Sequence, residues 1–253
     1  MSDAASKPKE KSKRTKRWYA LRIFGVFALA FALFASWALW VAWVPMGKAP
    51  EGDRAARMEA SPNSADGVFV NKQAMYNDVT GMFTNASSMS DHAEAKDPIP
   101  VYEKTEEELS RPANGTRVTW LGHSTVLMEI AGKRVLSDPI FGPTPFPIEA
   151  FGPKRWYEPP IPLEKLSDVD VVIISHDHYD HLDHPTIAAM ADWKTQFIVP
   201  LGVGAHLEYW GIPAERITEM DWWEEKTFGD LKIVATPARH ASGRQAFDQM
   251  RTL

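Results

Sequence analysis

A run of 22 residues without a charged side chain, Ile23–Val44, constrains this chain more than any other feature. A helix of that length rises about 33 Å at roughly 1.5 Å per residue, which is enough to cross a hydrocarbon core of about 30 Å. Aromatic residues suited to the two membrane interfaces lie at its ends: Trp18, Tyr19, Trp37, Trp40 and Trp43. We therefore predict a transmembrane anchor over residues 18–45, ended by Pro45.

A cleaved signal peptide is the alternative interpretation of this run. It is disfavoured because the run exceeds the usual apolar length of about 7–15 residues, and no small-x-small cleavage site precedes Met46. Residues 1–22 hold eight Lys and Arg against two acidic residues, whereas the segment after the run is mixed in charge. The positive-inside rule therefore predicts that residues 1–17 form a cytoplasmic tail and that the body lies on the far side, which in a bacterium is the periplasm.

Charge and cysteine content exclude several classes of function. Residues 23–253 carry 20 basic and 31 acidic residues, and a body this acidic argues against nucleic acid as a partner. The chain has no cysteine, so disulfides, thiolate-bound zinc and iron–sulfur clusters are excluded. Any metal must therefore be held by His and carboxylate side chains.

The body divides into an irregular and a regular part. Residues 46–115 show weak periodicity and loop-like composition, and we expect a linker and an irregular lead-in there. From residue 116 on, strands and helices alternate, which predicts a layered α/β fold with ligands at strand ends. The expected strands are Arg117–Leu121, Thr125–Ile130, Arg134–Ser137, Val171–Ser175, Phe197–Val199, Arg216–Met220 and Leu231–Ala235, and the expected helices are 185–193 and 203–210.

The sharpest motif is Ser-His-Asp-His-Tyr-Asp-His at residues 175–181, directly after an apolar strand. Side chains two residues apart in an extended segment point the same way, so His176 and His178 are expected to coordinate one metal ion. A turn after Tyr179 would aim Asp180 and His181 at a second position nearby. Imidazole and carboxylate are ligands that zinc, iron and manganese accept. The alternative is a polar loop of solvated residues.

Further ligands must come from elsewhere in the chain. His240 follows the last expected strand through a short polar link, so it is expected to reach the same edge of the sheet and to act as a ligand. His123 and Asp138 are weaker candidates for ligands. Each is equally interpreted as a direct ligand, as a residue that orients a ligand or faces the substrate, or as a residue that simply packs.

The metal motif resembles the signature of the metallo-β-lactamase superfamily. The flanking segments resemble, more narrowly, the N-acyl-phosphatidylethanolamine-hydrolysing phospholipase D group and its bacterial relatives. The matching segments run in order over residues 117–244: residues 119–124 (Thr-Trp-Leu-Gly-His-Ser), 137–141 (Ser-Asp-Pro-Ile-Phe), 152–155 (Gly-Pro-Lys-Arg), 174–183, 199–202 (Val-Pro-Leu-Gly), 221–225 (Asp-Trp-Trp-Glu-Glu) and 236–240 (Thr-Pro-Ala-Arg-His).

The resemblance implies an αββα sandwich over residues 116–253 that carries two metal ions, usually zinc. His176, His178 and His240 would hold the first ion, while Asp180 and His181 contribute to the second, with Asp180 as the catalytic carboxylate. A metal-bound hydroxide would attack the phosphodiester of an N-acyl phospholipid. The expected partners are accordingly the bilayer and a membrane lipid or a small phosphodiester. A lactonase or a soluble phosphodiesterase of the same fold is the alternative.

The family pattern extends beyond Leu253, with a bridging Asp and a further His. Residues 241–253 contain no His and only Asp248 as a carboxylate. The resemblance therefore implies a truncated sandwich with an exposed edge, a second site with two ligands, and weak or absent activity. A truncated, inactive metal-binding fragment is the corresponding alternative function.

Overall fold

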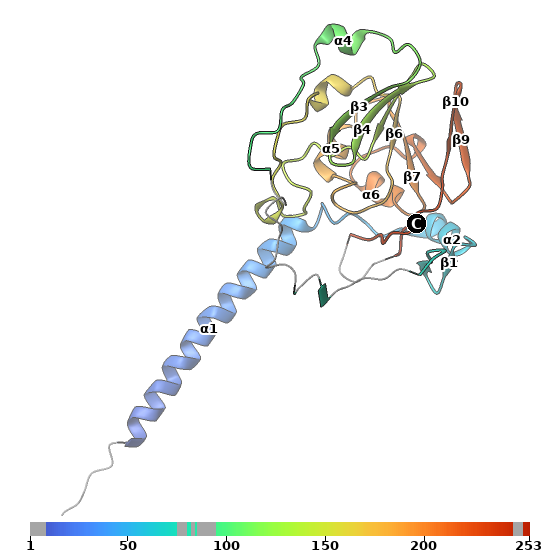
Figure 1. Ribbon diagram of the computed structural model, residues 1–253. Helices are drawn as coiled ribbons and strands as arrows, with labels where there is room; N and C mark the ends of the chain where they lie inside the picture. The colour runs from blue at the N-terminus through green and yellow to red at the C-terminus, as the bar shows by residue number, and fades with distance from the viewer. Residues whose placement is uncertain (1–8, 75–79, 82–83, 85–94, 245–249) are drawn as a thin grey trace, which may run out of the picture. The chain divides into compact units, whose positions relative to one another are not determined.

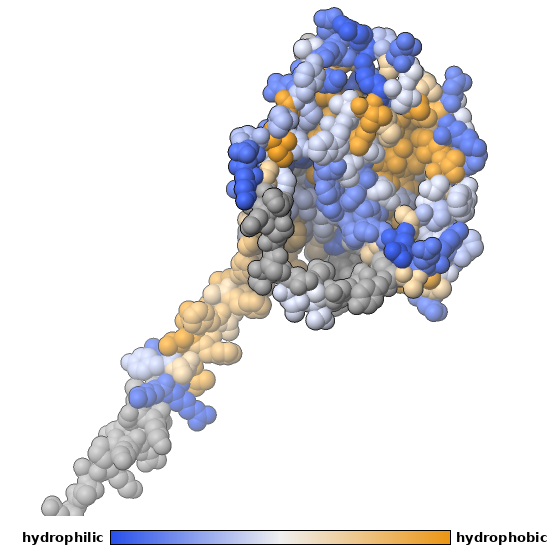
Figure 2. Space-filling model, in the orientation of Figure 1, coloured by the Kyte–Doolittle hydropathy of each residue, from blue (hydrophilic) through white to orange (hydrophobic). Residues whose placement is uncertain are grey.

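The computed structural model describes residues 9–74, 80–81, 84, 95–244 and 250–253, and the chain divides into two compact units, residues 1–43 and 44–253. The first unit holds the helix α1 (Lys9–Ala42). Its part from Lys16 to Ala42 is long and apolar enough to cross a membrane, a property that a signal sequence or a buried core helix shares. Its surface is hydrophobic over most of this length (Figure 2).

A six-stranded sheet forms the centre of the second unit (Figure 1). Its order is β3 (Arg117–Gly122), β4 (Thr125–Ile130), β5 (Lys133–Ser137), β6 (Val171–Ile173), β7 (Gln196–Pro200) and β8 (Ile217–Met220). The strands β3, β4 and β5 form an antiparallel meander, and β5 to β8 are parallel. Ala131 and Gly132 join β4 to β5 with φ angles of 51° and 70°, the left-handed conformation that a two-residue hairpin turn requires.

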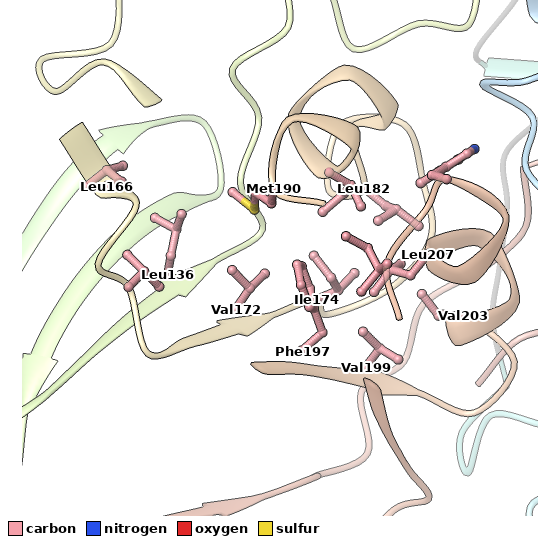
Figure 3. Close-up of a cluster of buried hydrophobic side chains, with 14 of the residues drawn as sticks. Leu136, Leu166, Val172, Ile174, Leu182, Met190, Phe197, Val199, Val203 and Leu207 are labelled. Atoms are coloured by element: carbon pink, nitrogen blue, oxygen red, sulfur yellow. The ribbon is translucent and has the colours of Figure 1, made fainter. Parts of the chain in front are cut away.

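One face of this sheet is covered by helices. The helices α5 (His184–Ala189) and α6 (Gly204–Tyr209) pack on it, and the 3₁₀ turns η1 (Glu149–Phe151), η2 (Leu163–Leu166) and η3 (Ala214–Arg216) lie in the connections. Figure 3 shows side chains of β6 and β7, among them Val172 and Phe197, pointing toward Leu182 and Leu207 on the helical side. Each of these four residues is fully buried.

The opposite face of the sheet packs against a hairpin made of β9 (Glu225–Phe228) and β10 (Leu231–Val234). Val171 and Ile198 alternate with Val172 and Phe197 along their strands, so they point to this second face. They pack with the following residues of β5, β8 and the hairpin: Val135, Met220, Phe228, Leu231 and Ile233. Figure 2 shows hydrophobic residues gathered between the sheet and the hairpin. The predicted α/β fold is confirmed. Within the described residues, the β9–β10 hairpin is what the six-stranded sheet has as a second β layer on this face.

The lead-in is more ordered than its composition predicts. It contains α2 (Gly52–Glu59), the two-residue strands β1 (Ser64–Ala65) and β2 (Val68–Phe69), and α4 (Glu106–Ser110). Ser61 and Asn63 donate hydrogen bonds to the two carboxylate oxygens of Asp221 at 2.6 and 2.8 Å. This contact bridges about 160 residues of sequence and has no local signature, so the composition of the lead-in did not indicate it.

Replacement of Phe197 by Ala tests the core. The ring is fully buried between the sheet and the helices, so its loss should lower the free energy of unfolding by about 3–5 kcal/mol. The measurement is denaturant unfolding of the detergent-solubilised full chain, followed by tryptophan fluorescence. Val118→Ala, at a side chain that is 63% exposed, is the control and should change it by less than about 0.5 kcal/mol. Equal midpoints for the two variants would contradict this packing.

Candidate metal centre

Three strands of the six-stranded sheet bring polar residues to one edge. The strands β3, β5 and β6 run in the same direction, since β3 and β5 are both antiparallel to β4 and β5 is parallel to β6. His123 follows β3, Asp138 follows β5, and the segment Ser175–His181 follows β6. Their carboxyl ends therefore meet at the edge where α/β folds place ligands.

The loop after β6 changes conformation halfway along. Ser175 donates from its backbone N and its Oγ to the two carboxylate oxygens of Asp138, each at 2.7 Å, which fixes where the loop leaves the sheet. His176 and His178 lie in the extended part. The backbone N–H groups of His181 and Leu182 then both donate to the carbonyl of His178, at 3.0 and 2.8 Å. This is the turn that the sequence predicts after Tyr179, and it brings Asp180 and His181 back toward the first two imidazoles.

The first ligand group consists of His176, His178 and His240. One ring nitrogen from each can be chosen so that all lie within 4.8 Å of one another. The ring centre of His240 lies 4.5 Å from that of His176 and 5.1 Å from that of His178. The structure thus brings together the three imidazoles that the resemblance assigns to one ion.

The second ligand group consists of His123, Asp180 and His181, whose ligand atoms also lie within 4.8 Å of one another. His123 Nε2 is 3.0 Å and His181 Nε2 is 3.7 Å from Asp180 Oδ2. His123 adopts a φ of 45°, an uncommon conformation for a residue with a side chain, which follows the glycine at the end of β3. The sequence alone left the role of His123 open, and the structure places it beside the two residues expected at the second site.

Asp138 lies behind His181 and outside both ligand groups. Its side chain is buried, and its Oδ2 is 2.9 Å from His181 Nδ1. This contact leaves the Nε2 of His181 directed toward Asp180. Asp138 therefore occupies the place of a residue that orients a ligand, one of the roles expected from the sequence.

The surroundings of His176 and His178 favour neutral imidazoles. Burial, together with the neighbouring His181, His178 and His240, lowers the pKa of His176 to about 4. Burial also lowers the pKa of His178. Burial acts in the same direction on His181, but the hydrogen bond to Asp138 and the charge of that carboxylate outweigh it, so the pKa of His181 is raised. Neutral imidazoles at such short separations offer lone pairs that one divalent cation would satisfy, so the donor set fits a metal.

Asp177, the second residue of the motif's His-Asp-His, points away from the ligands and is buried. Its carboxylate accepts hydrogen bonds from the Gly243 backbone N at 2.6 Å and from Thr252 Oγ1 at 2.9 Å. Arg244 Nη1 donates to the carbonyls of Asp177 and Leu182, each at 2.8 Å. The alternation of an extended segment predicts that Asp177 faces away from His176, so this signal was present in the motif.

Asn71 was not found by sequence reasoning. Its Nδ2 donates to the carbonyl of His240 at 2.9 Å, and its Oδ1 accepts from the His240 backbone N at 3.1 Å. These two bonds fix the backbone that carries the third imidazole. Nothing in the local sequence marks this contact, because the two residues are 169 positions apart.

A cavity of about 600 Å³ adjoins the ligands. His176, His181 and His240 line one part of it, and apolar residues of the sheet face and the hairpin line another, including Ile173, Ile198, Met220 and Ile233. The site therefore combines metal-ligating groups with an apolar compartment.

Residues 133–253 match the family described as "Beta-lactamase superfamily domain". This part of the chain is therefore similar to a metallo-β-lactamase superfamily domain. A protein of Mycobacterium tuberculosis is 41% identical over 196 residues, covering 74% of this chain and 51% of the relative. N-acyl-phosphatidylethanolamine-hydrolyzing phospholipase D 1 of Caenorhabditis elegans is 34% identical over 164 residues (61% and 46%), and a UPF0173 metal-dependent hydrolase of Metallosphaera sedula is 31% identical over 117 residues (38% and 46%). The chain spans about half the length of these curated relatives.

Removing two imidazoles of the superfamily's motif should remove metal. We expect His176→Ala combined with His178→Ala to lose at least one bound ion per chain, measured by inductively coupled plasma mass spectrometry after dialysis against buffer. His184→Gln is the matched control, because that ring packs 5.1 Å from Trp210 and belongs to neither ligand group. Equal metal content in the double variant and the wild type would show that these groups do not hold the ion.

Asp138→Asn should weaken metal binding without removing a ligand. An amide at this position cannot accept hydrogen bonds at both of its side-chain atoms, so the orientation of His181 is relaxed and metal affinity should fall about 10–100-fold. Competition with a chromophoric chelator measures the affinity. Ser137→Ala, at the neighbouring residue whose hydroxyl reaches only backbone carbonyls, should leave it unchanged. An unchanged affinity in Asp138→Asn would contradict the orienting role.

Proposed function

We propose that this protein is a membrane-anchored, zinc-dependent hydrolase of lipid phosphodiesters, with N-acyl phospholipids as the substrate class. The observation that carries the proposal is the proximity of the two ligand groups, whose His176 and His181 rings lie 4.1 Å apart between their centres. Relatives named as metal-dependent hydrolases and as N-acyl-phosphatidylethanolamine-hydrolysing phospholipases support the same reaction class.

Each of the two ligand groups is proposed to bind one metal ion. His176, His178 and His240 would hold one ion, and His123, Asp180 and His181 would hold a second. Zinc is the proposed metal because the donor set is imidazole and carboxylate, which are ligands that zinc accepts. When bound, zinc supplies a Lewis acid that polarises a phosphoryl oxygen and makes a coordinated water more acidic.

Asp180 is the proposed catalytic carboxylate of this chain. Burial raises its pKa, but the charge of His181, a backbone hydrogen bond, and the hydrogen bond and charge of His123 outweigh burial, so the pKa is lowered and the group is ionised at neutral pH. A carboxylate has two oxygens, so one can bind a metal while the other accepts a hydrogen bond from water. His123 contacts this carboxylate and is exposed, so it can also meet the substrate.

Two features favour a lipid over a soluble substrate. The cavity beside the ligands is largely apolar, as an acyl chain requires. The helix α1 would hold the site close to a bilayer, with residues 1–17 on the cytoplasmic side and the body on the other. A lactone or a soluble phosphodiester has no need of either feature.

The test is turnover by the purified full chain loaded with zinc. We expect N-acyl-phosphatidylethanolamine in mixed micelles to yield N-acylethanolamine and phosphatidic acid, detected by mass spectrometry. The His176→Ala/His178→Ala variant should lose at least about 100-fold in kcat/KM, and His184→Gln should not. Hydrolysis of a lactone or of a soluble phosphodiester alone would replace the lipid substrate, and no turnover of any of them by zinc-loaded protein would refute the hydrolase assignment for this chain.

A further inference from the structure

The segment that follows α1 is hydrogen-bonded into the body. Trp210 Nε1 donates to the carbonyl of Val44 at 2.8 Å, Arg244 Nη2 donates to the carbonyl of Pro45 at 2.8 Å, and the Lys48 backbone N donates to His206 Nδ1 at 3.1 Å. The helix ends at Ala42. At roughly 3.6 Å per residue, Pro45 can lie no more than about 11 Å from that helix end. The tether between the end of α1 and the first residues that the body holds is therefore only two to three residues long.

Contacts lead from this anchored segment to an aromatic loop. The Arg244 guanidinium that holds Pro45 lies 4.1 Å above the ring of Tyr179. The Tyr179 ring lies 6.3 Å from the ring of Phe146. A Cβ on Gly152 would come within 2.8 Å of the Phe146 Cβ, so the chain next to Phe151 packs on the same side chain. The loop of residues 146–156, called the aromatic loop below, thus lies next to the point where the body is tied to the helix.

The aromatic loop exposes large side chains to solvent. Phe146 is 45%, Phe151 is 56% and Trp156 is 59% exposed. Lys154 is also exposed within the loop, as is Glu149. Aromatic rings mixed with charged groups suit the headgroup region of a bilayer rather than its hydrocarbon core.

The same loop borders the second ligand group. Tyr157, directly after it, lies 6.1 Å from the ring of Trp120, and its hydroxyl lies close to Gly122, the residue before His123. At the other end, Tyr179, which contacts Phe146, sits between His178 and Asp180 in the chain. The aromatic loop therefore lies close to the segments that carry His123 and Asp180, two residues of the second ligand group.

We propose that the aromatic loop docks into the interface of the bilayer that α1 spans, with Phe146, Phe151 and Trp156 inserted among the lipid headgroups. The inference rests on the membrane anchorage proposed above and adds a second, peripheral contact with the same membrane. The short tether makes this contact intramolecular, so a small aromatic surface suffices to hold it. Docking would present the second ligand group directly to lipid headgroups.

The absence of cysteine allows a direct test by spin labelling. Single cysteines at Phe151→Cys and Trp156→Cys carry the label in the aromatic loop, Leu33→Cys marks the span, and Asp230→Cys, at the exposed turn of the β9–β10 hairpin, is the matched control. The full-length variants are reconstituted in vesicles of phosphatidylcholine and phosphatidylglycerol. Power-saturation paramagnetic resonance then measures the accessibility of each label to oxygen relative to a water-soluble nickel chelate.

We expect the oxygen-to-nickel ratio at residues 151 and 156 to exceed that at residue 230 several-fold and to remain below that at residue 33, because headgroups lie at a shallower depth than the middle of the span. Ratios at residues 151 and 156 equal to that at residue 230, with residue 33 in the bilayer, would overturn the docking proposal while leaving the anchorage intact. A water-like ratio at residue 33 would overturn both. None of these measurements depends on turnover, so they test the docking proposal independently of whether the proposed substrate is correct.

Discussion

The buried carboxylate of Asp177 is the constraint on which the metal centre depends. Burial raises the pKa of this group, but His206, the Gly243 N–H and Arg244 outweigh burial and hold the pKa at about 2. A charge buried in this way is tolerated only where its partners are in place, because leaving it unpaired costs several kcal/mol. These partners of Asp177 therefore hold the loop that follows β6 on the side opposite to the metal-ligating residues. Because side chains alternate along an extended strand, that restraint leaves His176 and His178 on the front.

Both ligand groups are built from separated segments held by non-metal contacts. Asp138 fixes Ser175 and His181, and Asn71 fixes His240, so each segment is positioned by hydrogen bonds between protein groups. The imidazoles are consequently held close together by the protein itself, and burial together with the neighbouring imidazoles lowers the pKa of His176. A preorganised set of neutral donors loses little conformational freedom on binding an ion.

Local patterns predicted the strands and the motif but not the long-range contacts. The span Thr125–Ile130 was predicted to the residue because its buried and half-buried side chains alternate. The strand expected over Val171–Ser175 is apolar up to Ile174 because β6 is covered on both faces, although the strand itself ends at Ile173. The strand β9 was missed, since its exposed Glu225 and Lys226 give it no apolar alternation. Asn71 could not be found, because its effect depends on a residue far along the chain.

The pairing of Asn71 with His240 has a consequence for biosynthesis. A ribosome adding about 5–20 residues per second would need roughly ten to thirty seconds to advance the 169 positions from Asn71 to His240. During that interval the nascent chain contains Asn71, and later the loop with His176 and His178, but lacks the third imidazole. A partly made chain would therefore hold an ion weakly, and the first ligand group would be completed only when residues beyond the β9–β10 hairpin have left the ribosome.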